Sequence, residues 1–430
     1  MSAGVCAASP GTAGLLIDPG RSTPEGLEEY RSRGGYTGLE QVLARGAGWA
    51  AEVVARARLR GRGPLGRPVA ERWRRVAAGP SAARYVIGNG AESLSISRKD
   101  RYLMANHPHR VLEGLLIAAR AVGAREAYLY VRGDSPESLA GLRSALEEAA
   151  RAGLVGEASV TGVQVRLQPS ATGPVSGEET AVIDALEGLE GRPQIRPPDP
   201  EASGLFGQPT LVQNVETLAA VAAVFREGLD RHLALGTADE PGSALFTVTG
   251  AVRRPGVYEL PLGTRLADLL RLAGADPAAV RAVLPGGLAS PPLWPQELDV
   301  PLSWADLGRA GSVLGNRTVI VLGPEASLPV QFAEIMQVLA EGSCGQCQGC
   351  ANGTRALAGY LAALAGLAGG TEGGAPAALP AFADPAELLA YARHQAHLLT
   401  RRAGICPYPE SVGRAMLRAL EVFCRVSPVR

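Results

Sequence analysis

Short apolar runs alternate with amphipathic segments through the first half of the chain. Tyr85–Gly88, Ala127–Val131 and Val163–Leu167 are apolar runs of strand length. His109–Val122 places apolar residues on one helical face, and Pro136–Ala152 opens with acidic and small residues, as helices do. This alternation predicts an α/β domain with a largely parallel sheet.

One polar loop stands where such a sheet would bind a ligand. Asn89-Gly-Ala-Glu92 directly follows the first apolar run. Ligands of parallel sheets gather at the loops that leave the carboxyl ends of the strands. We therefore expect this loop to be part of a site.

The pattern changes after residue 235. Gly236–Gly242 has the composition of a linker, and Phe246–Gly250, Arg254–Glu259 and a helix near Leu266–Ala273 suggest a small β-grasp module. From Leu328 onward the periodicity is helical. We predict three parts: N-terminal helices with the α/β domain over 1–235, the β-grasp module over 243–325, and a helical domain over 326–430.

Charge and apolar length exclude several classes of protein. The 430 residues include 42 basic and 42 acidic side chains, which are interspersed, so nothing predicts a nucleic-acid groove. The longest apolar tract, Leu357–Leu367, is too short to span a bilayer. With no targeting segment, we expect a cytoplasmic protein that reaches a membrane only through partner subunits.

Lysine usage is unusual. Lys99, in Arg98-Lys-Asp-Arg101, is the only lysine in the chain. An ammonium and a guanidinium are not interchangeable where space is tight, which favours a specific role for Lys99. The alternative is that this lysine survived by chance.

Four cysteines have the spacing of an iron–sulfur site. Cys344, Cys347 and Cys350 are each separated by two residues, and Cys406 lies downstream. This pattern favours a [4Fe–4S] cluster, while zinc is the alternative, although four-cysteine zinc sites usually consist of two separated pairs. Cys6 and Cys424 lie outside the set, and no signal peptide precedes them, so a disulfide scaffold is not expected.

Six segments, in order, resemble the NADH-oxidising flavoprotein subunit of respiratory complex I and its relatives in soluble hydrogenases and formate dehydrogenases. That family is an oxidoreductase family with a Rossmann-like FMN domain, a β-grasp module of the SLBB type and a helical domain with one [4Fe–4S] cluster. The resemblance implies the same order of domains here. The six segments are Gly61–Trp73, Asn89–Arg101, Gly177–Thr180, Gly207–Thr217, Ser343–Cys350 and Cys406.

The resemblance also implies roles for single residues. Glycines let the backbone approach a flavin or its phosphate, and Arg72 stands where the family has a lysine near that phosphate. Glu179 is the candidate catalytic residue beside the nicotinamide. For each carboxylate the plain alternative is a solvated charge, and for each asparagine a cap or turn. The candidate cofactor-binding residues are Gly61, Gly63, Gly66, Arg72, Asn89, Glu92, Lys99, Gly177, Glu178, Glu179 and Asn214.

The chain departs from the family where NADH would stack, because arginines and an aspartate replace aromatic rings. These changes lead to the hypothesis that Arg67 pairs with Asp199 or another carboxylate and closes the pocket, or that arginines recognise the 2′-phosphate of NADPH. The departures are Pro64, Arg67, Arg75, Ala91, Leu94, Pro174, Arg196, Asp199 and Gln213.

Two functions follow. The first is an FMN- and [4Fe–4S]-containing subunit that takes hydride from NADH or NADPH and passes single electrons to partner redox subunits, expected to be iron–sulfur proteins. The second is an electron-transfer or scaffold subunit that keeps the cluster but no longer binds NADH. The lost aromatic rings favour the second, whereas the retained Gly177–Thr180 and Lys99–Arg101 favour the first.

Overall fold

The computed structural model describes residues 5–8, 15–92, 96–170, 173, 175–366, 384–401 and 404–426. The side chains of Cys6 and Cys424, and all of Leu94 and Pro174, lie outside the described residues. The chain divides into two compact units. One contains residues 1–248, 254–264 and 301–303, and the other contains residues 249–253, 265–300 and 304–430.

A four-stranded parallel sheet organises the first unit. Its strands are β2 (Tyr85–Gly90), β3 (Glu126–Arg132), β4 (Gln164–Ser170) and β5 (Thr210–Asn214). The strand order is β4-β3-β2-β5, with every neighbouring pair parallel. The chain therefore builds outward from β2 through β3 to β4 and then returns to add β5 on the other side of β2. The prediction of an α/β fold with a parallel sheet is confirmed.

Both faces of this sheet are covered by apolar residues. Successive side chains of a strand point to opposite faces. Val86 accordingly belongs to the large core cluster and Ile87 to a smaller one; Leu129 and Tyr130 on β3 divide in the same way. The smaller cluster also contains Val182 of α8 (Glu179–Leu186).

One central helix explains the large core. Nearly every residue of α6 (Pro108–Val122) is buried, because other helices and the sheet surround it. The surrounding helices include α2 (Thr37–Arg45), α3 (Ala47–Arg56), α7 (Pro136–Arg151) and α9 (Val215–Glu227). A helix that is buried all round need not be amphipathic. Gly114 permits its close contact with α9, since a Cβ at this glycine would lie 1.9 Å from the Leu218 carbonyl oxygen.

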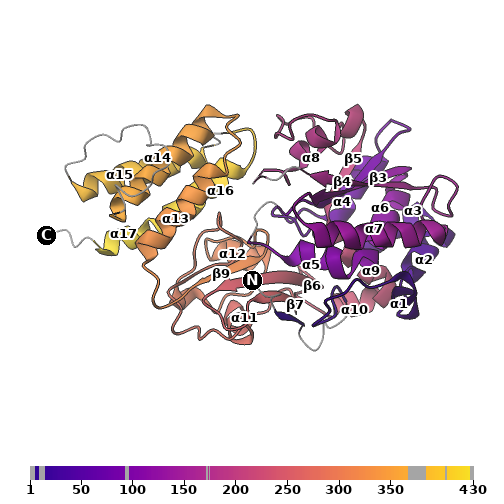
Figure 1. Ribbon diagram of the computed structural model, residues 1–430, viewed down its shortest axis with the longest axis horizontal. Helices are drawn as coiled ribbons and strands as arrows, with labels where there is room; N and C mark the ends of the chain where they lie inside the picture. Colours follow the sequence, from indigo (N-terminus) through magenta and orange to yellow (C-terminus); the bar gives the residue numbers. More distant parts are fainter. Residues whose placement is uncertain are drawn as a thin grey trace. The chain divides into compact units, whose positions relative to one another are not determined.

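Shorter helices complete the first unit (Figure 1). We expected the N-terminal segment to be helical, but residues 5–8 form strand β1 (Val5–Ala8), which runs parallel to β7 (Gly256–Pro261). The remaining helices are α1 (Leu27–Ser32), α2 (Thr37–Arg45), α3 (Ala47–Arg56), α4 (Val69–Ala77), α5 (Lys99–Asn106), α7 (Pro136–Arg151), η1 (Leu205–Gly207) and α10 (Leu229–Leu233).

The segment predicted as a β-grasp module begins with the expected two strands and helix, and further strands and short helices follow. Strands β6 (Ser243–Gly250) and β7 (Gly256–Pro261) are antiparallel, and α11 (Leu266–Leu272) follows. Strand β8 (Ala282–Leu284) is antiparallel to β9 (Thr318–Leu322). Between them lie η2 (Pro295–Glu297) and α12 (Trp304–Arg309).

The C-terminal part of the second unit is helical. It contains α13 (Leu328–Glu341), α14 (Gln348–Leu364), α15 (Pro385–Thr400), α16 (Tyr408–Ala419) and α17 (Glu421–Val426). Helix α14 packs on α13 and α15, and α15 packs on α16 (Figure 1). The cysteine triplet lies at the junction of α13 and α14.

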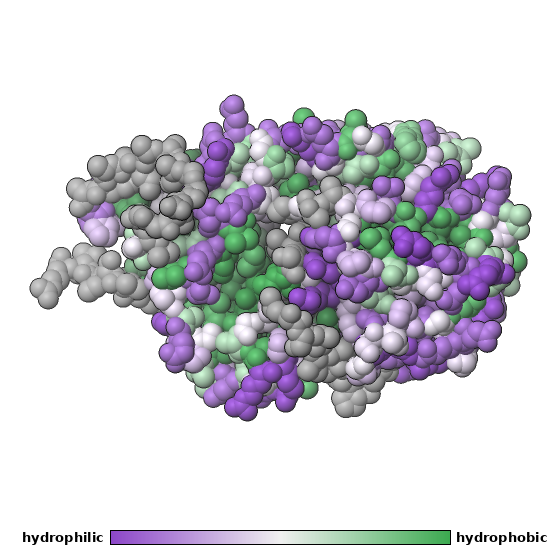
Figure 2. Space-filling view, in the orientation of Figure 1, coloured by the Kyte–Doolittle hydropathy of each residue, from purple (hydrophilic) through white to green (hydrophobic). Residues whose placement is uncertain are grey.

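The described part of the chain contains no helix that is long and apolar enough to cross a membrane. On the face drawn in Figure 2, hydrophilic and hydrophobic residues are interspersed over the α/β unit. This mixture agrees with the scattered charges of the sequence.

Candidate functional site

The strand order places one switch point in the parallel sheet. The chain leaves β2 toward β3 on one side, while β5 lies on the other side of β2. The last pair in the β2–β5 register is Asn89 and Asn214, so both asparagines stand at the carboxyl ends of adjacent strands. Ligands of open α/β sheets bind at such a point.

The two asparagines connect the loops around the switch point. Asn89 Nδ2 donates to the carbonyl oxygen of Gly177 (2.9 Å), and its Oδ1 accepts from the amide of Ala91 (3.1 Å). Asn214 Nδ2 donates to Asp100 Oδ2 (2.8 Å), while its Oδ1 caps α9 by accepting from Glu216 N (3.0 Å). The structure therefore brings together these segments, which are far apart in sequence.

Glu92 holds the beginning of α5. Its side chain is 3% exposed and accepts hydrogen bonds from Ser97 Oγ (2.6 Å), Asp100 N (3.1 Å) and Arg101 N (3.2 Å). Burial and the neighbouring Asp100 carboxylate raise the pKa of Glu92. The carboxylate thus joins the loop that follows β2 to the first turn of α5.

The side chain of Lys99 is buried beside this loop and is not exposed to solvent. Its side chain is 2% exposed, and Nζ lies 2.6 Å from Asp100 Oδ1 and 2.8 Å from Glu216 Oε2. The ammonium joins the first turns of α5 and α9. A tight position between two buried carboxylates explains why arginine does not replace it.

The glycine-rich run approaches the same helix terminus. Arg62 N donates to Thr217 Oγ1 in the first turn of α9 (2.8 Å), and Gly61 N donates to the Arg67 carbonyl oxygen (2.8 Å). Gly66 has φ +57°, and a Cβ at Gly63 would meet no atom within 4 Å. The run therefore forms a narrow turn with open space at Gly63, where a ligand can approach the backbone.

Arg72 reaches from α4 to two carboxylates. Nη1 lies 2.8 Å from Glu179 Oε1, and Nε lies 2.5 Å from Glu201 Oε1. Burial opposes ionisation of Glu201, but the guanidinium of Arg72 outweighs it and lowers the pKa of this carboxyl. The Arg72 Nη2 group is buried and has no hydrogen-bond partner. A donor of this kind fits a phosphate oxygen.

Arg196 holds the paired glutamates from the other side. Its Nη2 lies 2.5 Å from Glu178 Oε1, and its Nη1 lies 3.4 Å from Glu179 Oε2 and 3.8 Å from Asp199 Oδ1. Glu178 also caps α8 by accepting from Thr180 N (2.8 Å) and Ala181 N (3.1 Å). The Asp199 carboxylate thus pairs with Arg196. Of the partners proposed for Arg67, Asp199 or another carboxylate, the other carboxylate stays a prediction; the positive charge of Arg67 acts on Glu201 and helps to lower its pKa.

Two further departures from the family pattern have structural partners. Gln213 is buried and accepts from Trp73 Nε1 (3.3 Å). Arg75 pairs with Glu71 one turn away on α4, with both side chains about half exposed.

Glu201 was not predicted from the sequence, since nothing in the order of residues indicates that it contacts Arg72.

The four predicted cluster ligands form a second site. Cys344 lies between α13 and α14, Cys347 is the N-cap of α14, Cys350 is in its first turn, and Cys406 precedes α16. All four are thiols. The N-termini of α14 and α16 carry partial positive charge, which stabilises thiolates.

Hydrogen bonds and charges link these cysteines. Ile405 N donates to Cys347 Sγ (3.4 Å), and Ser343 Oγ lies 3.6 Å from Cys350 Sγ. Burial, together with the charges of Cys344 and Cys347, raises the pKa of Cys350. Mutual repulsion of thiolates is relieved when they bind iron.

The chemistry of the donor set fits an iron–sulfur cluster. Three thiols at CxxCxxC spacing with a remote fourth are the ligands of a [4Fe–4S] cube, whereas four-cysteine zinc sites usually consist of two separated pairs. Within the described ranges, a group of three ligand atoms that all lie within 4.8 Å of one another is formed by Asp18, Glu25 and His107, and it contains none of these cysteines.

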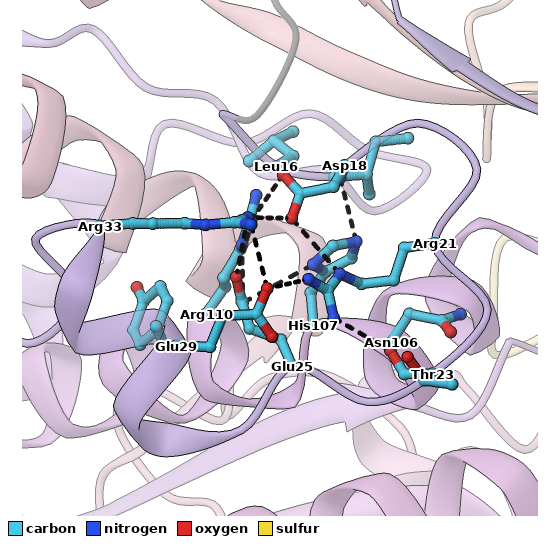
Figure 3. A network of polar contacts seen from close by, with 12 residues as sticks. Leu16, Asp18, Arg21, Thr23, Glu25, Glu29, Arg33, Asn106, His107 and Arg110 are labelled. Carbon is cyan, nitrogen blue, oxygen red and sulfur yellow. Dashed lines mark hydrogen bonds and ion pairs between the residues drawn. The ribbon is translucent and has the colours of Figure 1, made fainter.

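The Asp18, Glu25 and His107 group is an ion network and not a cation site (Figure 3). Arg110 Nη2 lies 3.0 Å from Asp18 Oδ1 and 3.1 Å from Glu25 Oε1. Asp18 N donates to His107 Nε2 (3.1 Å). A cation would have to displace the arginine. The network therefore holds the segment before α1, with Asp18 and Glu25, against the first turn of α6.

Two segments of the chain match known family models. Residues 54–223 match the Nuo51 FMN-binding domain, and residues 245–281 match the SLBB domain. These matches confirm the predicted FMN domain and the SLBB module after it. They contain every candidate cofactor-binding residue of the first unit, from Gly61 to Asn214.

Relatives match over most of the chain. The F subunit of the NADH-quinone oxidoreductase of Aquifex aeolicus is 37% identical over 330 residues, which is 75% of this chain and 76% of the relative. The corresponding F subunit of Streptomyces coelicolor is 35% identical over 76% of this chain and 74% of its own length.

A solved structure extends the similarity to the fold. One chain of an NAD+-reducing [NiFe]-hydrogenase in the H2-reduced state is 31% identical, with a TM-score of 0.80 over 95% of this chain and 68% of that chain. The predicted family resemblance is thus confirmed. The chain belongs to the family that comprises the F subunits of NADH-quinone oxidoreductases.

Proposed function

We propose that this protein is an FMN- and [4Fe–4S]-containing electron-transfer subunit that accepts hydride from NADH and passes single electrons to a partner redox subunit. FMN accepts two electrons as hydride and releases them singly. The observation that carries this proposal is the presence, in one chain of this family, of an FMN-binding domain and a four-thiol set.

The first unit would hold the flavin at the switch point. The turn Gly61–Gly66 offers backbone N–H groups and open space, and Arg72 Nη2 offers a buried donor to the phosphate. Asn89 and Asn214 fix the surrounding loops, and Gly177 is held by Asn89. Of the predicted cofactor-binding residues, Glu92 and Lys99 would stabilise the segments around the site through their contacts with the first turns of α5 and α9.

Glu179 would stand beside the nicotinamide. It lies between Arg72 and Arg196, which pair with its two carboxylate oxygens. A carboxylate accepts hydrogen bonds from ribose or carboxamide groups and so would orient the dinucleotide for hydride transfer. The family assignment favours NADH over NADPH as the donor.

The second unit would hold the cluster on Cys344, Cys347, Cys350 and Cys406. We propose the division into 1–235, 243–325 and 326–430 as the functional one: flavin domain, SLBB module and cluster domain. The partners are other redox subunits of a multi-subunit complex, and association with a membrane would occur through them.

The scaffold alternative has less support. It rests on the lost aromatic rings and on the ion pairs that Arg196 makes with Glu178 and Glu179. Glu178 and Glu179 nevertheless remain in the site, and the match to the FMN-binding domain covers residues 54–223, which include every candidate flavin-binding residue.

Anaerobic titration tests the proposal. Protein with FMN and iron–sulfur content near one each should lose flavin absorbance on addition of NADH, and then show an electron paramagnetic resonance signal from the reduced cluster. The Glu179→Gln variant should bind FMN but bleach more slowly. Protein that takes up FMN yet is not reduced by millimolar NADH or NADPH would support the scaffold alternative.

A further inference from the structure

Cys350 differs from the other cluster cysteines in burial. It is 6% exposed, whereas Cys344, Cys347 and Cys406 are half-buried. A buried thiolate has little help from water, so the polar groups around its sulfur decide how well it carries negative charge. The Ser343 hydroxyl is such a group, with its oxygen 3.6 Å from Cys350 Sγ.

Two contacts fix the direction of this hydrogen bond. Gly345 N lies 3.4 Å from Ser343 Oγ and donates to it, which occupies one lone pair of the oxygen. Between a serine and a thiol either atom could donate. A cysteine that binds iron is a thiolate without a hydrogen, so the serine must donate to the sulfur.

We propose that Ser343 raises the reduction potential of the cluster through its hydrogen bond to Cys350. This inference rests on the proposed function, because it requires the cluster. Reduction moves one electron from the flavin to the cluster and leaves more negative charge on the ligating sulfurs. A donor stabilises that charge more in the reduced state, and hydrogen bonds to sulfur are known to set the potential.

Ser343 is the side chain through which this effect can be tested. A second donor to a cluster sulfur, Ile405 N, belongs to the backbone and stays in every side-chain variant. Ser411 offers a matched control, since its hydroxyl donates to the Pro407 carbonyl oxygen (3.1 Å) beside Cys406 and not to a sulfur.

The experiment is a potentiometric titration of the cluster signal by electron paramagnetic resonance, on the full chain carrying FMN and cluster. Ser343→Ala should shift the midpoint to a more negative potential. Ser343→Thr keeps the hydroxyl and should restore the parent midpoint. Ser411→Ala should also titrate like the parent. An unchanged midpoint in Ser343→Ala, or an equal shift in the threonine variant, would overturn the inference.

Two measures keep the test decisive. If Ser343→Ala loses the cluster, Ser343→Gly is titrated instead. If neither variant keeps it, the reduced parent protein is exposed briefly to D2O, and electron–nuclear double resonance should detect a rapidly exchanging deuteron coupled to the cluster; its absence contradicts the proposal. Parent protein without iron and sulfide would refute the proposed function itself, whereas a cluster with an unshifted midpoint refutes only the role of Ser343.

Discussion

Arg196 holds two adjacent glutamates of the flavin site. With Arg67 and Arg72 it supplies three positive charges, against the four carboxylates of Glu178, Glu179, Asp199 and Glu201. FMN and NADH are anions, so their binding depends on this small difference between the positive and negative charges of the site. Loss of one guanidinium makes the site more negative.

Arg196→Gln should therefore weaken FMN binding by about tenfold, which corresponds to about 1.4 kcal/mol. Quenching of flavin fluorescence gives the dissociation constant. Arg192→Gln is the control, because Arg192 pairs with Glu190 and both are exposed. Tighter FMN binding in Arg196→Gln would contradict this expectation and would mean that the arginine blocks the site.

His107 makes stability depend on pH. Burial lowers its pKa to about 4, against an ordinary value of about 6.5. The folded state therefore disfavours the protonated form. The contribution of His107 to the unfolding free energy is fully present above pH 6.5 and is lost as the pH falls toward 4. The reason is that the unfolded chain binds a proton at this histidine in a pH range where the folded chain does not.

Between pH 7.5 and 5.0 the parent should lose about 2 kcal/mol more unfolding free energy than His107→Gln. Glutamine retains an acceptor for Asp18 N but does not titrate. Urea denaturation at the two pH values measures the difference. His394→Gln, at an exposed position on α15, should behave like the parent. Equal losses in parent and His107→Gln would show that the histidine accepts a proton in the folded state.

At the scale of elements, Lys99 joins the first turns of α5 and α9. Asp100 and Glu216 are its partners, and all three side chains are at most 4% exposed. Removing one partner from a buried ion group costs about 3–5 kcal/mol because a charge remains uncompensated. The same geometry explains the retention of a single lysine in the chain.

Lys99→Met should thus lower the unfolding free energy of the first unit by about 3–5 kcal/mol. Lys99→Arg should also be destabilised, since the guanidinium is larger than the space filled by the ammonium. The neutral triple variant with Asp100→Asn and Glu216→Gln should recover part of the loss. Arg271→Met, which breaks an exposed pair with Asp268, should change little. Denaturant titration distinguishes these cases, and a stable Lys99→Arg protein would leave the lysine unexplained.

For the whole molecule, two compact units imply more than one unfolding transition. Cys347→Ser should lower iron content and the midpoint of the transition assigned to the second unit. FMN affinity should remain near that of the parent, because the flavin residues belong to the first unit. Cys424→Ser should keep the iron, as the spacing of the cysteines predicts. Stoichiometric zinc in place of iron in the parent would contradict the cluster assignment.

Element positions were largely predictable because they depend on local patterns. Strand β2 begins at Tyr85 as predicted, and α6 begins one residue before the expected His109. The CxxCxxC spacing likewise needs only a short stretch of chain to indicate a cluster. By contrast, the pairing of Asp199 with Arg196 was not predicted, since charge alone does not distinguish Arg67 from Arg196.

The sequence by itself determined the α/β pattern, the order of the segments and the four thiols, because periodicity and spacing act over a few residues. Only the tertiary structure decided which charges meet. Arg72 and Glu201 are 129 positions apart, and Asn89 and Gly177 are 88 positions apart. Asn89 and Gly177 meet because parallel strands bring their carboxyl ends to one edge of the sheet. Arg72 of α4 meets Glu201 in the loop that leads to β5, where Thr210 N donates to the Pro200 carbonyl oxygen. Both contacts depend on how distant segments pack, so no local pattern of residues predicts them.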